Sequence, residues 1–379
     1  MDVKKPAGAG KRFGIKPDSW YIRSPSQIPI KPAAMRQFFR SFLGHPSISR
    51  IQPSTFFNVS LTDLGASDSR LTGIFMPASE VGEEKIGLSE QFLANADLYH
   101  SRYSASDDST MLLRNALAES GWRPPAAPVI LDIGTGSGAN SVIPCLRTFE
   151  DCRILATDLS PDLLAILQLY LKKESLDHRV ACVCTDSMKN HFKQGQFDLV
   201  YGSAILHHLI DPTTALQAAF SALKPGGAAM FIEPFEGFSL IGSVFQRILD
   251  EENSDDKRIT DDSRNFFKAI CTDLAARRGT DKSDIRFRYM DDKWLFTRTY
   301  FQESAKRIGY KGMTIVPYLT PDSSRHYQSS VEILIRCSGL DPKAIMPDWA
   351  WAYIAQLDDS FSPEMKKDAL LEGTVVFHK

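Results

Sequence analysis

The chain has 379 residues, of which 43% are hydrophobic and 24% charged, and its formal net charge is −2. These proportions are typical of a globular protein and argue against a disordered or fibrous chain. No apolar run approaches the ~20 residues that a membrane helix needs, and the N-terminus lacks the apolar core of a signal peptide, so we expect no membrane partner and a cytoplasmic location.

The N-terminal region is basic. Residues 1–50 contain ten Lys or Arg against two Asp, a balance of +8, so the rest of the chain carries −10. A basic segment can attract nucleic acid, an anionic substrate or an anionic surface. Here the basic residues are spread out and are not clustered with stacking aromatic residues, which favours a solvated terminus. We expect residues 1–14 to form a disordered basic arm.

Two kinds of pattern follow the basic arm. Residues 15–86 have many Pro and Ser, short apolar pieces and no long helical period, which predicts an irregular or β-containing N-terminal addition. Residues 87–103 have a helical pattern with aromatic side chains on one face, among them Tyr99. Such a stripe can close a ligand site, although it is also typical of plain core. A second helix is expected over 109–120.

A glycine-rich run follows the first buried segment. In residues 129–139, Val-Ile-Leu-Asp-Ile-Gly-Thr-Gly-Ser-Gly-Ala, a short apolar stretch leads into a turn with Gly134, Gly136 and Gly138. Glycine lets the backbone approach a ligand that a Cβ would exclude, and the helix that follows offers unpaired N–H groups. The run therefore predicts a nucleotide-binding edge of a sheet.

Two ligands remain open at this turn. Asp132 disfavours a pyrophosphate, and it can hold the ammonium group of an amino-acid-like cofactor such as S-adenosylmethionine. However, Gly134, Gly136 and Ala139 also satisfy the fingerprint of NAD-binding sheets. Asp158 ends the next apolar segment, where an acidic residue accepts hydrogen bonds from ribose hydroxyls in either family. It supports an adenosine ligand without naming it.

Three further segments favour the first ligand. They are Cys-Thr-Asp-Ser-Met at 184–188, the run 197–209 that ends in Leu-His-His-Leu, and the run 223–234 that begins Leu-Lys-Pro-Gly-Gly. With the acidic glycine turn, their order and spacing resemble the class I S-adenosylmethionine-dependent methyltransferases. The resemblance covers roughly residues 87–340.

The resemblance implies roles for particular residues. In that family, the residue that matches Asp186 approaches the adenine amino group, and the segment that matches Gly202 and Ser203 lies under the methionine end of the cofactor. A helix like 87–103 lies over the cofactor. The cofactor-binding residues expected here are Asp132, Gly134, Thr135, Gly136, Gly138, Asp158, Leu159, Asp186, Ser187, Ser203 and Tyr99.

The fold class expected is α/β. Strands are predicted near 128–133, 153–157, 179–184, 198–203 and 228–233. Helical segments separate them, which implies a parallel sheet covered on both faces. Strand-like runs at 312–319 and 331–337 are expected as the reversed final pair of the family's seven-stranded sheet, an ending that NAD-binding sheets lack. The prediction is a Rossmann-like, doubly wound sheet with its last strand reversed.

Additions surround this core in the predicted domain organisation. A methyltransferase domain is expected over 87–340. Within it, residues 235–310 are expected to be a helical insertion at the carboxyl edge of the sheet, where they can act as a lid. Residues 341–379 are expected as a C-terminal addition whose tryptophans either dock on the core or form a partner surface.

The cysteines do not indicate a metal centre. None of the six forms a C-x-x-C pair, and no histidines at zinc-ligand spacing accompany them. Cys182 and Cys184 alternate at strand period, so we interpret them as buried thiols of a reduced protein. No clustered carboxylates mark another kind of site, and we predict no metal.

Candidate catalytic residues follow two of the strands. His207 and His208 come after the fourth predicted strand, at the rim where acceptor and methyl group should meet, and either imidazole can remove a proton near neutral pH. A histidine at this position of the family often only shapes the pocket. Glu233 leaves the fifth strand and is a second candidate base or substrate anchor, or a cap for the turn that follows it.

The function predicted is transfer of a methyl group from S-adenosylmethionine to a small-molecule acceptor, with oxygen the first candidate nucleophile. Ser-Ala-Ile-Leu at 203–206 replaces the Asn-Pro-Pro-Tyr type of segment, and the core lacks basic-aromatic patches, so nucleic acid is disfavoured as a partner. A homodimer is compatible with the sequence. An NAD-linked oxidoreductase and an inactive binding or assembly module stay open as alternatives.

Overall fold

The computed structural model describes residues 50–83, 96–97, 100, 108–252 and 257–379. The described residues all belong to one compact unit, 48–379. The predicted basic arm and most of the predicted helix at 87–103 lie outside the described residues. Within the described part, no helix is long and apolar enough to cross a lipid bilayer.

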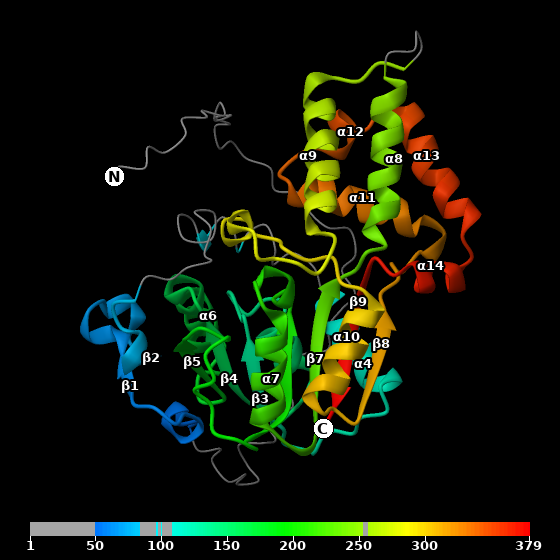
Figure 1. Cartoon of the computed structure of the whole chain (residues 1–379). Helices are drawn as coiled ribbons and strands as arrows, with labels where there is room; N and C mark the ends of the chain where they lie inside the picture. Colours follow the sequence, from blue (N-terminus) through cyan, green and yellow to red (C-terminus); the bar gives the residue numbers. More distant parts are fainter. Residues whose placement is uncertain (1–49, 84–95, 98–99, 101–107, 253–256) are drawn as a thin grey trace, which may run out of the picture. The chain divides into compact units, whose positions relative to one another are not determined.

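A mixed sheet forms the centre of this unit (Figure 1). Its strand order is β1-β2-β5-β4-β3-β6-β7-β9-β8. The strands are β1 Leu61–Asp63, β2 Ile74–Pro77, β3 Val129–Ile133, β4 Arg153–Asp158, β5 Val180–Cys184, β6 Phe197–Ser203, β7 Leu223–Pro234, β8 Gly312–Pro317 and β9 Glu372–His378.

The five strands from β3 to β7 lie where the apolar runs predicted them. They pair in parallel, and the register places Asp132 beside Ala156 of β4 and Tyr201 of β6. Every residue of β3 and β5 is buried, because helices cover both faces of the sheet. Parallel pairing brings the carboxyl ends of these strands to one edge, which is where the predicted cofactor residues between 132 and 203 lie.

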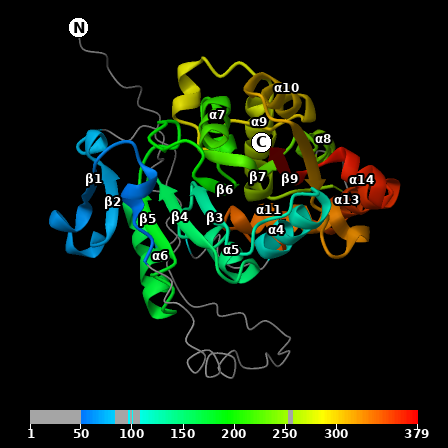
Figure 2. The same ribbon diagram turned by 90° about the horizontal axis from the view of Figure 1, so that it is seen from below.

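Helices cover the two faces of the sheet (Figure 2). One layer consists of α4 Asp108–Glu119, α5 Val142–Thr148 and α6 Pro161–Lys173, and the other of α7 Pro212–Ala222 and α10 Arg298–Ile308. Side chains cap several of these helices: Ser160 accepts a hydrogen bond from the N–H of Leu163 at the start of α6, and Asp211 accepts from Thr213 at the start of α7. The expected helix at 109–120 corresponds to α4.

Two more strands extend the sheet beyond the family pattern. β2 pairs in parallel with β5, with Ile74 beside Cys182, and β1 pairs antiparallel with β2. Both strands come from the N-terminal segment in which β structure was expected. The sheet therefore has nine strands in the described residues, against the seven predicted.

The prediction of a strand at 331–337 is wrong. These residues belong to the helix α11, His326–Cys337, and the buried positions Tyr327, Val331 and Ile335 follow one another at helical spacing. The alternating β-branched residues in this run misled the prediction. The reversed strand is β9 instead, which lies between β7 and β8 and is antiparallel to both. Residues 372–378, expected as part of an addition, thus complete the sheet.

Helices from the C-terminal part of the sequence form a third hydrophobic cluster. They are α8 Phe238–Glu251, α9 Asp261–Arg277, α11, α12 Pro342–Ile345 and α13 Asp348–Ser360, and the short helix α14 Pro363–Ala369 follows them in the chain. Phe245, Phe267, Val331 and Ile354 are buried in this cluster, and Trp349 packs against it. The C-terminal tryptophan thus docks on apolar side chains, one of the two roles expected for it. α10 belongs to the sheet layer, because it contacts α7 and β8.

Seven short 3-10 helices complete the secondary structure of the described residues. They are η1 Pro53–Phe56, η2 Leu64–Ala66, η3 Ser69–Leu71, η4 Ala78–Glu80, η5 Leu206–His208, η6 Ile285–Arg288 and η7 Ser323–Arg325. η5 follows β6 directly, so it places the two histidines beside the carboxyl ends of the parallel strands.

Candidate cofactor and acceptor site

The glycine turn has the backbone that its sequence predicts. Gly134, Gly136 and Gly138 all have positive φ, at 68°, 54° and 75°, which favours glycine at each position. A Cβ on Gly134 would also lie 2.4 Å from Cγ1 of Ile205, the residue just before η5. The turn and the loop after β6 are therefore in close contact.

Asp132 lies fully buried under this turn. Its Oδ2 accepts hydrogen bonds from the hydroxyls of Thr135 and Ser141, each at 2.6 Å. Its Oδ1 has no hydrogen-bond partner among the described residues. Burial raises the pKa of Asp132 to about 7, although the two hydroxyls lower it. An unpaired buried carboxylate oxygen is costly, and a cationic ligand group would compensate it.

The pKa of Asp132 predicts how stability depends on pH. Since the folded-state pKa of about 7 lies above the ordinary value of 3.8, the unfolded chain loses this proton first as pH rises. We expect this group to lower the free energy of unfolding by roughly 2 to 3 kcal/mol between pH 5 and pH 8. Urea unfolding at both pH values, compared between wild type and Asp132→Asn, measures the difference. An equal pH slope in the two proteins would contradict the assignment.

Asp158 ties the end of β4 to the glycine turn. Its Oδ2 accepts a hydrogen bond from the N–H of Gly136 at 2.7 Å, and its Oδ1 accepts from Ser160 at 2.8 Å. Asp158 and the adjacent Leu159 are both half-buried. A carboxylate oxygen can accept more than one hydrogen bond, so these contacts are compatible with the expected role toward ribose hydroxyls.

Asp186 and Ser187 follow β5 and meet a residue that the sequence did not suggest. Glu80 is buried, and its carboxylate accepts hydrogen bonds from the Thr185 hydroxyl at 2.6 Å and the Asp186 N–H at 3.1 Å. The Oδ1 of Asp186 accepts from Met188. The N-terminal addition thus positions the segment predicted to approach adenine.

The structure describes only some of the remaining residues predicted to bind the cofactor, which are Ser203, Tyr99 and the helix at 87–103. Ser203 ends β6 and is half-buried, beside the exposed Ala204, whose φ is 56°. Tyr99 lies outside the described residues. His100 is described, and its Nδ1 lies 2.7 Å from the hydroxyl of Ser137 in the glycine turn. One residue of the predicted helix is therefore in contact with the turn.

Glu233 and His207 form a buried pair beside the end of β6. Glu233 accepts hydrogen bonds from the N–H groups of Ile205, Leu206 and His207, and from the His207 Nδ1 at 2.6 Å. It therefore caps the turn at η5, and not the turn after β7 that the sequence had suggested. Because both carboxylate oxygens of Glu233 already accept hydrogen bonds within the protein, this side chain is better suited to position His207 than to act on a substrate.

Asp292 contacts both histidines. Nothing in the sequence pattern had suggested this residue. Its Oδ1 lies 3.4 Å from Nε2 of His207 and 3.3 Å from Nδ1 of His208, and its Oδ2 lies 3.2 Å from Nη1 of Arg277. Burial disfavours a charge on His207, but Glu233 and Asp292 outweigh it and raise its pKa to about 9. Burial and the neighbouring charge of His207 lower the pKa of His208.

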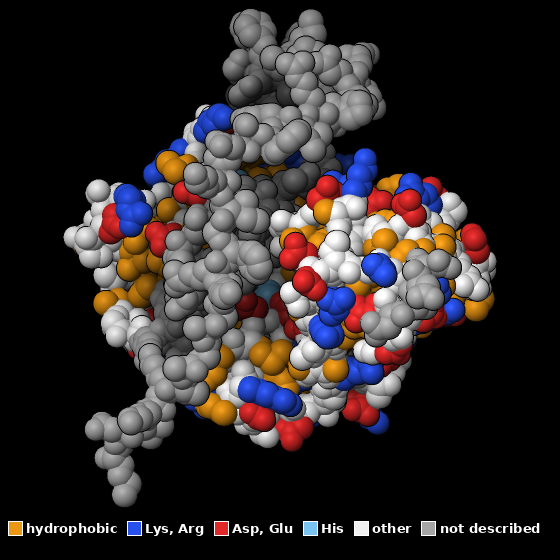
Figure 3. Space-filling view, turned by 90° about the horizontal axis from the view of Figure 1, so that it is seen from above, with side chains coloured by type: hydrophobic (Ala, Val, Ile, Leu, Met, Phe, Trp, Pro, Cys, Tyr) orange, Lys and Arg blue, Asp and Glu red, His pale blue; other side chains and the backbone are white. Residues whose placement is uncertain are grey.

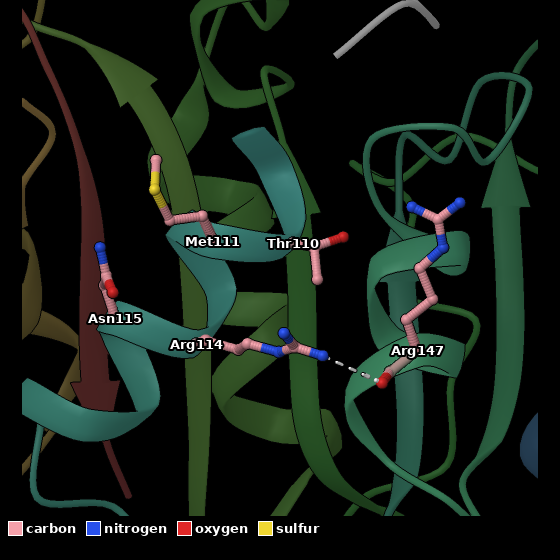
Figure 4. A pocket seen from close by; sticks show the side chains of 5 residues that line it. All are labelled: Thr110, Met111, Arg114, Asn115 and Arg147. Atoms are coloured by element: carbon pink, nitrogen blue, oxygen red, sulfur yellow. Dashed lines mark hydrogen bonds between the residues drawn. The ribbon is translucent and has the colours of Figure 1, made fainter. Parts of the chain in front are cut away.

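The face seen from above shows a histidine beside acidic side chains near its centre (Figure 3). Two depressions lie elsewhere. One, of about 390 Å³, lies between α4 and α5, where Arg114 donates a hydrogen bond to the carbonyl of Arg147 at 3.4 Å (Figure 4). The other, of about 830 Å³, is lined by α7, α10 and residues 280–294. Neither contains the glycine turn.

Comparison with known proteins decides between the two ligand families. A family model described as a methyltransferase domain matches residues 130–227, which include all of β3 but its first residue, the glycine turn and the strands β4 to β6. Over these residues the chain is a methyltransferase domain, in line with the resemblance to the class I S-adenosylmethionine-dependent enzymes. The reversed β9 is in keeping with this, because NAD-binding sheets lack that ending.

Two curated proteins and one solved structure are similar to this chain. The chain is 31% identical over 105 residues to a malonyl-[acyl-carrier protein] O-methyltransferase of Marinomonas, covering 28% of this chain and 37% of that protein. It is 30% identical over 112 residues to phosphoethanolamine N-methyltransferase 2 of Caenorhabditis elegans, covering 29% and 24%. A solved Haemonchus contortus phosphoethanolamine N-methyltransferase 2 shares 16% identity, with a TM-score of 0.44 and coverage of 77% and 58%. The chain matches well under half the length of the two curated relatives.

Proposed function

We propose that this protein transfers a methyl group from S-adenosylmethionine to a small-molecule acceptor, with oxygen as the first candidate nucleophile. The observation that carries the proposal is the unpaired, buried Oδ1 of Asp132 directly under the glycine turn. An ammonium group would complete its hydrogen bonding, whereas a diphosphate would add negative charge to it.

The residues at this edge fit the cofactor by their chemistry. Asp132 would hold the ammonium group, and the glycine turn with Thr135 would lie against the methionine part, near Ser203. Asp158 and Leu159 would meet the ribose, and Asp186 and Ser187 the adenine. Gly134 and Gly136 are half-buried, so a ligand can reach their backbone. The relatives act on oxygen in one case and on nitrogen in another, as their names state, which leaves oxygen a proposal.

The acceptor side requires little chemistry from the protein. The bound cofactor supplies a methyl group that its sulfonium already activates. The chain must align the acceptor, exclude water and, for a hydroxyl, assist loss of its proton. His208 is the candidate for contact with the acceptor, because its side chain is 25% exposed while that of His207 is 8% exposed. His207 and Glu233 act as positioning residues in this proposal.

The acceptor role predicts a specific effect of His208→Ala. We expect turnover to fall roughly 10²-fold while the affinity for S-adenosylhomocysteine stays within a factor of about three, because the proposal places His208 at the acceptor and Asp132 at the cofactor. Turnover with labelled cofactor and calorimetric titration measure the two quantities. The control is His178→Ala, from a half-buried histidine just before β5. An unaltered turnover in His208→Ala would reduce this histidine to pocket lining.

The proposed reaction can be tested without knowing the acceptor. The protein is incubated with isotopically methyl-labelled S-adenosylmethionine and the small-molecule fraction of a cell extract, and the products are analysed by mass spectrometry. We expect a labelled species whose mass is raised by one methyl group, absent with Asp132→Ala. If only protein or nucleic acid in unfractionated extract acquires the label, the small-molecule assignment is wrong.

A further inference from the structure

Three potential metal ligands converge beside η5. His207 and His208 come from η5 itself, and Asp292 comes from the segment between η6 and α10. The ligand atoms of the three side chains all lie within 4.8 Å of one another. We propose that His207, His208 and Asp292 bind one divalent metal ion of the zinc type. The prediction of no metal could not take this group into account, because only the fold brings Asp292 to the histidines.

The distances suit a shared ion. Asp292 Oδ1 lies 3.4 Å from His207 Nε2 and 3.3 Å from His208 Nδ1. An ion with bonds of about 2.0 to 2.1 Å in tetrahedral geometry separates its ligand atoms by about 3.3 Å. Two imidazoles and a carboxylate are also a ligand set that zinc and similar transition metals accept, with a further position open to a small molecule.

Outer partners orient two of the three ligands. Glu233 accepts a hydrogen bond from Nδ1 of His207, which directs Nε2 of that ring toward Asp292. Arg277 contacts Oδ2 of Asp292 at 3.2 Å, which leaves Oδ1 toward the histidines. Metal-binding histidines commonly have such a carboxylate partner on the other ring nitrogen.

A metal ion can reach these three side chains from solvent, but its binding would break an existing hydrogen bond of His208. The side chains of His208 and Asp292 are 25% and 37% exposed, so an ion can enter from solvent. Nδ1 of His208 lies 3.0 Å from the carbonyl of Asp291 and donates a hydrogen bond to it. An ion at this nitrogen would replace that hydrogen bond, and the ring proton would be held on Nε2 instead.

The ion would have a use in methyl transfer, and this part rests on the proposed function. The three ligands lie just beyond β6, on the side where the acceptor is expected. A divalent ion there would bind an acceptor oxygen and lower the pKa of its hydroxyl. The substrate class favoured is therefore a small molecule with a hydroxyl or carboxylate that can enter the open position of the ion.

Metal binding is measured on the full chain without an affinity tag. After treatment with a chelator, the protein is dialysed against Zn²⁺ alone, and bound zinc is determined by mass spectrometry. We expect one zinc per chain, with affinity at least about 100-fold lower in Asp292→Asn, because one of three ligands is lost. The matched control is Asp273→Asn, since Asp273 also pairs with Nη1 of Arg277 at 3.2 Å but is not a ligand.

A second readout and a second ligand variant distinguish the loss of a metal ligand from misfolding of one variant. Co²⁺ in place of Zn²⁺ should give a visible absorption band in the wild type and the control, and this band should be lost in His208→Gln as well as in Asp292→Asn. Less than stoichiometric zinc in the wild type, or a wild-type zinc content in both ligand variants, would overturn the proposal and leave the group as an ion-pair network. Zinc binding without any methyl transfer would instead count against the proposed function.

Discussion

Replacing Asp132 with asparagine is expected to lower the affinity for S-adenosylhomocysteine roughly 100-fold. Asparagine keeps the shape of the side chain and can still accept hydrogen bonds from Thr135 and Ser141, which both bond to Oδ2 of the wild-type carboxylate. What it removes is the negative charge that the proposal assigns to the ligand ammonium. A buried charge-assisted hydrogen bond of this kind contributes about 2 to 3 kcal/mol, which corresponds to that loss of affinity.

A second aspartate in the same sheet provides the control for Asp132. Asp198 lies near the start of β6, at the opposite edge, where its carboxylate accepts from the N–H of Val129 and from Lys224. We expect Asp198→Asn to lower stability without changing the affinity for S-adenosylhomocysteine. Isothermal titration calorimetry at one pH compares the three proteins. Wild-type affinity for S-adenosylhomocysteine in Asp132→Asn would show that Asp132 is not the partner of the ligand ammonium group.

Gly134→Val is expected to abolish measurable binding of S-adenosylhomocysteine. At Gly134 the backbone has a φ of 68°, which a β-branched residue adopts only at a cost, and a Cβ would lie 2.4 Å from Ile205. The substitution therefore strains the turn and displaces the loop that leads to His207. Both sides of the proposed site should be affected.

The control for Gly134→Val separates backbone strain from steric conflict. Gly226 has a φ of 80°, but a Cβ there would have nothing within 4 Å. Gly226→Val should carry the strain of a positive φ without the contact with Ile205. Thermal unfolding checks that both variants fold, and calorimetry compares their affinities. Equal affinities for S-adenosylhomocysteine in the two variants would contradict the role given to the close approach at Gly134.

Local patterns were sufficient for the parallel core of the fold. The runs from β3 to β7 are short, apolar and bounded by turn residues. Such segments can be predicted as strands from the local sequence, without knowledge of the strands with which they pair. The last strand was different. Residues 331–337 combine alternating β-branched residues with buried positions at helical spacing. Their packing against other helices favours the helix α11 over a strand. Glu372–His378 becomes a strand because it fits between β7 and β8, a long-range pairing that no local pattern specifies.

The candidate site shows the same division between local and long-range information. The glycine turn and Asp132 are adjacent in sequence, so the motif contains most of that geometry. Glu80 and Asp292 reach the site from additions for which no family pattern was available. The pair Asp291-Asp292 has no periodicity of its own, and only its proximity to the two histidines in the fold makes it informative.

The proposed role of Asp132 is to select a ligand with an ammonium group at the glycine turn. Calorimetric titration of the full chain with S-adenosylhomocysteine and, separately, with NAD measures this selectivity. We expect stoichiometric binding of S-adenosylhomocysteine and no binding of NAD. Stoichiometric binding of NAD, with no heat from S-adenosylhomocysteine, would show that the turn binds a dinucleotide and that Asp132 does not hold an ammonium group.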